Sequence, residues 1–225
     1  MIKAVVFDMD GTLLDTESVY QRVWRETAKE FGIEESRIDR AVNECSGRNP
    51  HDTRLYFEEN LADMADYDEF VERRRVYYDA EIERIGGIPL KAGVKELMDC
   101  LKGQGMLIAL ATATRRERTM DNLEKTGLIS YFDAIITGDM VTNGKPHPET
   151  FLTAAAALGV KPEECIGVED SFHGVRAIHA SGMVTVMIPD VKQPTPEIAA
   201  LVDHQCENLL QVGDILQQLN QSGAN

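Results

Sequence analysis

Two aspartates, Asp8 and Asp10, lie two positions apart directly after the apolar run Ala4–Phe7. A run without polar alternation is typical of a strand that is buried on both faces of a parallel sheet. Ligands of such sheets bind at the carboxyl ends of the strands. Two buried carboxylates repel each other unless a cation neutralises them, and Mg²⁺, which prefers oxygen ligands, would also attract a phosphate. The pattern fits a reaction centre, but it also fits a solvated acidic turn, because Asp-Gly pairs are common in turns.

Three further polar segments follow predicted strands: Thr112-Ala113-Thr114, Gly144-Lys145-Pro146 and Glu169-Asp170-Ser171. Each has a purely structural alternative. Thr112 could cap a helix, and Lys145 could be an ordinary surface lysine. Glu169 and Asp170 could stabilise the dipole of the helix that follows them. Because the segments occur in order after strands of one predicted sheet, we expect them to meet at the same edge as Asp8.

The periodicity of the remaining sequence predicts the elements that position these segments. Strands are expected at 4–7, 106–111, 134–137, 165–168 and 185–188, and helices at 92–102, 116–126, 148–158, 172–181, 196–201 and 209–219. Strands that alternate with helices indicate a parallel sheet with right-handed connections. We therefore predict an α/β fold with a three-layer, Rossmann-like parallel sheet core.

A purely helical stretch interrupts this core. Amphipathic patterns predict helices at 18–31, 35–44, 50–61 and 68–85, with no strand signal between them. The stretch is closed by Gly86-Gly87-Ile88-Pro89, a sequence suited to a hinge. We predict a core domain of residues 1–15 and 88–225 and an inserted all-helical domain of residues 16–87.

Composition limits the classes of partner. The 225 residues include 38 acidic and 23 basic side chains, and the formal charge of −15 opposes binding to nucleic acid or to an anionic membrane. The 4 cysteines form no CxxC pair, which argues against a zinc site or a disulfide framework. No apolar run approaches the ~20 residues of a membrane span, and no signal peptide is evident. We expect a cytoplasmic monomer.

Four segments of the chain resemble the four motifs of the haloacid dehalogenase (HAD) superfamily. They are Asp8-Met9-Asp10-Gly11-Thr12, Leu110-Ala111-Thr112, Gly144-Lys145-Pro146-His147-Pro148-Glu149 and Gly167-Val168-Glu169-Asp170-Ser171. The helical insert is similar to the type 1 cap domain of the subgroup that includes β-phosphoglucomutase and phosphatases of small sugar phosphates and nucleotides. True dehalogenases of the superfamily lack the second aspartate, so by this resemblance Asp10 indicates phosphoryl transfer.

Residue chemistry and resemblance together predict the catalytic roles. Asp8 would attack phosphorus and form an aspartyl phosphate. Lys145 would balance the charge of the site, and the Thr112 hydroxyl and the Ala113 N–H would bind phosphate oxygens. Asp10 would protonate the leaving alcohol and then take a proton from the water that hydrolyses the intermediate.

The predicted cofactor is Mg²⁺. Its ligands would be the carboxylates of Asp8 and Asp170 and the backbone carbonyl of Asp10, with Glu169 binding directly or through water. A phosphate oxygen and water molecules would complete the octahedron.

The predicted function is a Mg²⁺-dependent phosphatase that hydrolyses a small phosphate monoester, such as a sugar phosphate or a nucleotide. Specificity would come from the cap domain, where Thr16, Glu17, Tyr20 and Arg48 are the candidates. Arg74 and Arg75 are interpreted as structural.

A β-phosphoglucomutase is the alternative, but the mutase pattern calls for a histidine where Tyr20 lies. A catalytically silent phosphosugar-binding module is a third hypothesis, although a binder has no need of both Asp8 and Asp10.

Overall fold

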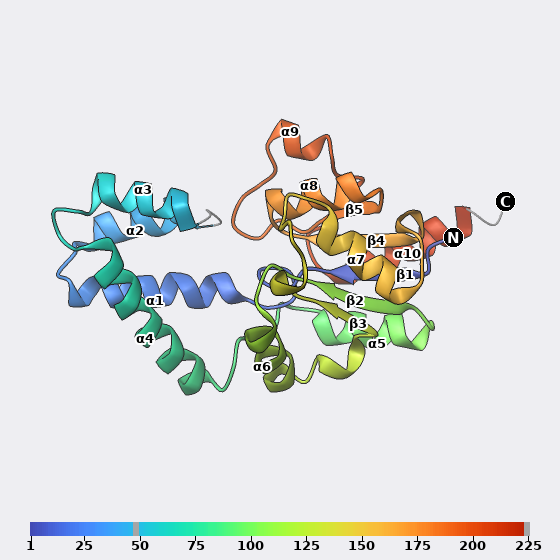
Figure 1. Ribbon diagram of the computed structural model, residues 1–225, viewed down its shortest axis with the longest axis horizontal. Coiled ribbons are helices and arrows are strands. Elements are labelled where there is room, and N and C mark those ends of the chain that lie inside the picture. The colour runs from blue at the N-terminus through green and yellow to red at the C-terminus, as the bar shows by residue number, and fades with distance from the viewer. Residues whose placement is uncertain (47–49, 223–225) are drawn as a thin grey trace. The chain divides into compact units, whose positions relative to one another are not determined.

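The computed structural model describes residues 1–46 and 50–222. The chain forms two compact units (Figure 1). The sheet unit comprises Met1–Asp15 and Pro89–Asn225, and the helical unit comprises Thr16–Ile88. The sequence prediction drew the second boundary one residue earlier, before Ile88.

The sheet unit is built on a parallel sheet of 6 strands in the order β3-β2-β1-β4-β5-β6. The strands are β1 (Ala4–Phe7), β2 (Leu107–Ala111), β3 (Ala134–Ile136), β4 (Cys165–Glu169), β5 (Val184–Met187) and β6 (His204–Gln205). Phe7 at the end of β1 is in register with Leu110 of β2 and with Val168 of β4. This register brings the carboxyl ends of the three central strands to one edge.

Helices cover both faces of the sheet. They are α5 (Val94–Gly103), α6 (Arg116–Thr126), α7 (Glu149–Leu158), α8 (Phe172–Ser181), α9 (Pro196–Ala199) and α10 (Leu210–Ser222). One face packs on α7 and α8, which contact each other, while α5 contacts β2 and packs on α10. All four residues of β1 are completely buried, as the apolar run predicted. The predicted three-layer α/β fold is confirmed.

The helical unit contains α1 (Thr16–Glu30), α2 (Glu35–Cys45), α3 (Pro50–Asn60) and α4 (Tyr67–Ile85). Its core is aromatic: the ring centroids of Trp24 and Phe70 lie 4.9 Å apart, and those of Phe57 and Phe70 are also 4.9 Å apart. Asp66 caps the start of α4 by accepting from the N–H groups of Asp68 and Glu69. The four predicted helices are thus observed within about one turn of their expected bounds.

The prediction missed the short elements. Strand β6 has only two residues, too few to show a period, and the 3₁₀ helices η1 (Ile129–Tyr131), η2 (Gly138–Met140) and η3 (Pro162–Glu164) have three each. Helix α5 begins after its predicted start because Gly93, with φ +84°, turns the chain just before it. No helix among the described residues is both long enough and apolar enough to span a membrane.

Candidate active site

The candidate site lies where the order of the strands reverses. Strand β1 lies between β2 and β4, and open parallel sheets bind ligands at such a switch point. Asp8 follows β1 directly, and its N–H donates to Val168 O over 3.0 Å. Gly11 then turns the chain with φ +87°. A Cβ at Gly11 would lie 2.4 Å from Asp170 Oδ2, so the tight approach of these two segments requires glycine.

A buried lysine joins two of the predicted acidic residues. Lys145 Nζ lies 2.5 Å from Asp8 Oδ1 and 2.8 Å from Glu169 Oε1. The three side chains are only 7%, 9% and 2% exposed, so the interpretation of Lys145 as a surface lysine is wrong. Glu149 at the start of α7 accepts from the N–H groups of Thr142 and Asn143, which fixes the loop that carries Lys145.

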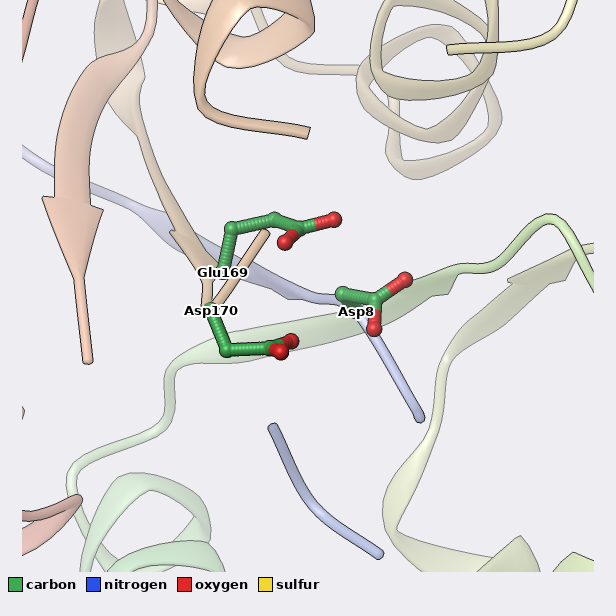
Figure 2. Close-up of side chains that lie close together, drawn as sticks. All are labelled: Asp8, Glu169 and Asp170. Atoms are coloured by element: carbon green, nitrogen blue, oxygen red, sulfur yellow. The ribbon is translucent and has the colours of Figure 1, made fainter. Parts of the chain in front are cut away.

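Three carboxylates form a group that could hold a metal ion. One oxygen from each of Asp8, Glu169 and Asp170 lies within 4.8 Å of the others. Figure 2 shows the Glu169 and Asp170 side chains, which leave the end of β4, extending toward Asp8. Asp170 Oδ1 accepts from Thr12 Oγ1 over 2.9 Å, and Glu169 Oε2 accepts from the Ser171 N–H over 2.6 Å. An all-oxygen set with one lysine for three clustered carboxylates, of which Asp8 and Glu169 are buried, fits a hard divalent cation.

The pKa values of Asp8 and Asp170 are raised, as expected where negative charges outnumber positive ones. Burial, reinforced by Glu169 and Asp10 and opposed by Lys145, raises the pKa of Asp8 to about 8. Burial and the charges of Glu169 and Asp8 raise the pKa of Asp170 well above its ordinary value. Burial alone would lower the pKa of Lys145, but the two carboxylates outweigh it, so the lysine stays charged. A divalent cation would stabilise the ionised carboxylates.

The segment after β2 brings polar groups to the same edge. Thr112 is buried, and its N–H donates to Ile136 O over 3.0 Å. Its hydroxyl oxygen accepts from the Thr114 N–H over 3.1 Å, which shapes the turn. Ala113 is exposed beside it. Helix α6 begins only at Arg116, so Thr112 is not its N-cap.

Asp10 has a partner that sequence reasoning missed. Thr114 Oγ1 donates to Asp10 Oδ2 over 2.6 Å, across 104 positions of the chain. Burial raises the pKa of Asp10, while the Thr114 hydrogen bond and Arg118 oppose the shift. The Asp10 carboxylate lies outside the group formed by Asp8, Glu169 and Asp170. In the sequence, the only sign of this contact was the hydroxyl of Thr114 in Thr112-Ala113-Thr114, and sequence reasoning gave Thr114 no role.

Three of the candidate specificity residues, Thr16, Glu17 and Tyr20, lie in α1. Thr16 begins that helix, and Gln21 bridges Glu17 Oε1 and Ser46 Oγ, at 3.3 Å each. Arg48 lies outside the described residues. These positions therefore remain predictions.

Arg74 and Arg75 of α4 differ in their surroundings. Arg74, interpreted as structural, donates from Nη1 to the Tyr20 hydroxyl over 2.6 Å. Its guanidinium carbon lies 4.8 Å from the centroid of the Tyr20 ring. Arg75 is exposed.

Known proteins resemble the chain over most of its length. It is 33% identical over 188 residues to a phosphorylated carbohydrates phosphatase of Thermotoga maritima, covering 81% of this chain and 82% of that protein. It is 32% identical over 215 residues to a β-phosphoglucomutase of Bacillus subtilis, covering 92% of each. A HAD family hydrolase of Deinococcus radiodurans, solved with bound phosphate and sodium, matches at 25% identity with a TM-score of 0.76, covering 91% of this chain and 90% of that one.

The family model for haloacid dehalogenase-like hydrolases matches residues 2–182. This range contains all four motifs on which the resemblance was based. It also includes the whole helical unit. The chain therefore belongs to the haloacid dehalogenase-like hydrolase family.

Proposed function

We propose that the protein is a Mg²⁺-dependent phosphatase that hydrolyses small phosphate monoesters through an aspartyl phosphate on Asp8. The observation that carries the proposal is the buried contact of Lys145 with Asp8 and Glu169, at 2.5 and 2.8 Å. A carboxylate attacks a phosphoryl group only where the negative charge of both is neutralised. Lys145 supplies one positive charge beside the Asp8 carboxylate.

The metal site would be formed by Asp8, Glu169 and Asp170, with the backbone carbonyl of Asp10 as the further predicted ligand. When bound, Mg²⁺ would neutralise negative charge on the phosphoryl group and fix its orientation. Thr12 orients Asp170 through its hydrogen bond, and Ser171 orients Glu169. The Thr112 hydroxyl and the Ala113 N–H would bind the remaining phosphate oxygens.

Asp10 would serve as the general acid and then as the general base. It is two residues from the nucleophile, and the Thr114 hydroxyl holds its carboxyl group. In the first step it would give its proton to the leaving alkoxide as the bond to phosphorus breaks. In the second it would take a proton from the attacking water, which regenerates the free Asp8 carboxylate and inorganic phosphate.

The proposed substrate is a phosphorylated carbohydrate or a similar small metabolite. This rests on the Thermotoga maritima relative, a phosphatase of phosphorylated carbohydrates. The phosphate in the Deinococcus radiodurans structure supports phosphate binding by this fold. Thr16, Glu17, Tyr20 and Arg48 would supply contacts to the rest of the substrate.

A phosphosugar mutase is the second candidate, because the Bacillus subtilis relative is a β-phosphoglucomutase. A tyrosine at position 20, where the mutase pattern calls for a histidine, favours a phosphatase over a mutase. Burial, against the opposing charge of Arg74, raises the pKa of Tyr20 above its ordinary value, so the phenol stays neutral. A neutral phenol cannot accept and return a proton near neutral pH as a histidine does.

Phosphate release from a panel of sugar phosphates, nucleotides and p-nitrophenyl phosphate, with Mg²⁺ or EDTA, tests the proposal. Mg²⁺-dependent release is expected. No release from any ester would favour a binding module.

To test the mutase, the enzyme receives β-glucose 1-phosphate, Mg²⁺ and a trace of the 1,6-bisphosphate. Glucose 6-phosphate that accumulates far faster than inorganic phosphate would identify a mutase.

Asp10→Asn should impair substrates with poor leaving groups most. General acid catalysis contributes about 10²- to 10⁴-fold where the leaving group needs a proton. We expect kcat/KM for glucose 6-phosphate to fall by about 10³-fold, and that for p-nitrophenyl phosphate by about 10-fold or less. Steady-state kinetics on both esters measures the contrast. Equal losses would contradict the proposed role of Asp10.

Metal binding should stabilise the fold. Because a ligand of the native state stabilises by about 2.7 kcal/mol at 100 times its Kd, saturating Mg²⁺ should raise the Tm of the wild type by several degrees. Asp170→Asn removes one of the three carboxylates and should abolish most of this increase. Thermal denaturation in EDTA and in graded Mg²⁺ provides the measurement. An equal Mg²⁺ effect on both proteins would argue against a site at Asp170.

A further inference from the structure

Thr114 lies in the turn between β2 and α6. Its side chain is hydrogen-bonded to Asp10, and its backbone carbonyl is hydrogen-bonded to another segment. Thr114 Oγ1 donates to Asp10 Oδ2 over 2.6 Å. The carbonyl oxygen of the same Thr114 accepts from the Gly138 N–H over 3.0 Å. Thr114 thus links Asp10 to the segment that follows β3.

Asp139 fixes the other end of this turn. Its Oδ1 accepts from the Arg116 N–H over 3.0 Å and from Thr137 Oγ1 over 2.6 Å. The two segments are packed tightly, since a Cβ at Gly138 would lie 2.1 Å from the carbonyl oxygen of Ala113. The turn is therefore restrained both at Thr114 and at Arg116.

These contacts set the rotamer of the proposed proton donor. The Thr114 hydroxyl donates to Asp10 Oδ2, which leaves Oδ1 to carry the proton that Asp10 would transfer. If the turn shifted, this bond would lengthen and Asp10 would lose its orientation. A displacement of about 1 Å in a positioned group can cost on the order of 10² in rate.

We propose that Thr114 and Asp139 are positioning residues for Asp10, with Thr114 acting directly and Asp139 through the backbone of the turn. The proposal rests on the proposed function, in which Asp10 protonates the leaving group. Neither residue need touch the substrate. Loss of either residue should lower kcat/KM most for substrates with poor leaving groups. It should leave the affinity for phosphate unchanged.

The kinetic test uses two esters of similar shape, phenyl phosphate and p-nitrophenyl phosphate. Phenolate needs a proton to leave far more than p-nitrophenolate does. For Thr114→Val, which keeps the shape but removes the hydroxyl, we expect kcat/KM to fall by about 30-fold for phenyl phosphate and by less than about 3-fold for p-nitrophenyl phosphate. Thr114→Ser, which keeps the hydroxyl, should stay near the wild type with both.

Asp139 offers an equally matched pair of variants. Both of its hydrogen bonds use Oδ1, so Asp139→Asn can keep them through its carbonyl oxygen, whereas Asp139→Ala cannot. We expect Asp139→Ala to repeat the leaving-group pattern at about 5-fold for phenyl phosphate, with Asp139→Asn near the wild type. Competitive inhibition by inorganic phosphate should be unchanged within about twofold in every variant.

Equal losses for the two esters, or weakened inhibition by phosphate, would overturn the proposal in favour of a phosphate-binding role. Unchanged kinetics in Thr114→Val would overturn it outright. Crystal structures of the variants give a readout that does not need turnover: Asp10 should leave its rotamer in Thr114→Val and Asp139→Ala only. If the wild type hydrolyses no ester of the wider panel, the proposed function fails, and these structures still decide whether Thr114 and Asp139 orient Asp10.

Discussion

Asp8→Asn should abolish turnover, with kcat reduced on the order of 10⁴-fold or more, as is usual when a covalent nucleophile is removed. The amide nitrogen and oxygen of asparagine are poor nucleophiles toward phosphorus, so no covalent intermediate can form. Lys145 and the other donors would still hold the phosphate, and the substrate should therefore still bind. Phosphate release and equilibrium binding, measured on the same preparation, separate the two effects.

The fold should survive this substitution. Asparagine has nearly the shape of aspartate, and Lys145 keeps Glu169 as a partner at 2.8 Å. Removing one of three crowded carboxylates also relieves their mutual repulsion. A suitable control is Asp121→Asn on the exposed face of α6, where Asp121 pairs with Lys125 at 2.8 Å. Turnover of the Asp8→Asn protein near that of this control would contradict the nucleophile assignment.

Elements with a strong local pattern were predictable from sequence. Strand β1 is buried on both faces, so its apolar run was continuous and its bounds were predicted correctly. Helix α6 ends at Thr126 because Gly127 adopts φ +71°, a C-cap that the sequence shows as a glycine after the last helical residue. The meeting of the motif residues followed from topology, since parallel strands deliver their carboxyl ends to one edge.

Long-range contacts between side chains were not predictable in the same way. No periodicity links Thr114 to Asp10, which lie 104 positions apart. Sheet topology predicted that Lys145 and Asp8, 137 positions apart, would meet, but it did not give their 2.5 Å contact. The role of Asp139 depends on the close packing of Gly138 against Ala113. Such contacts form only when the chain packs into its fold, and a single sequence does not give the distances between side chains that lie far apart along it.

Lys145→Met should lower kcat by about 10²- to 10³-fold, the usual cost of removing one charge-stabilising group from a catalytic site. Methionine keeps an unbranched apolar stem beside Phe151, whose ring centroid lies 4.7 Å from Lys145 Nζ. The loss should therefore reflect the missing charge more than missing volume. Turnover of p-nitrophenyl phosphate and of a sugar phosphate should fall together, unlike the pattern expected for Asp10→Asn.

The same substitution should destabilise the metal-free protein, by about 3–5 kcal/mol as for other broken buried ion pairs. The reason is that Asp8 and Glu169 would remain buried without their shared cation. If so, adding Glu169→Gln to Lys145→Met should recover part of the loss, because it removes one of the two unpaired charges. Lys125→Met breaks an exposed pair and should change stability little. Urea unfolding in EDTA measures all four proteins, and a double variant no more stable than Lys145→Met would show that packing, rather than charge, makes Lys145 important for the fold.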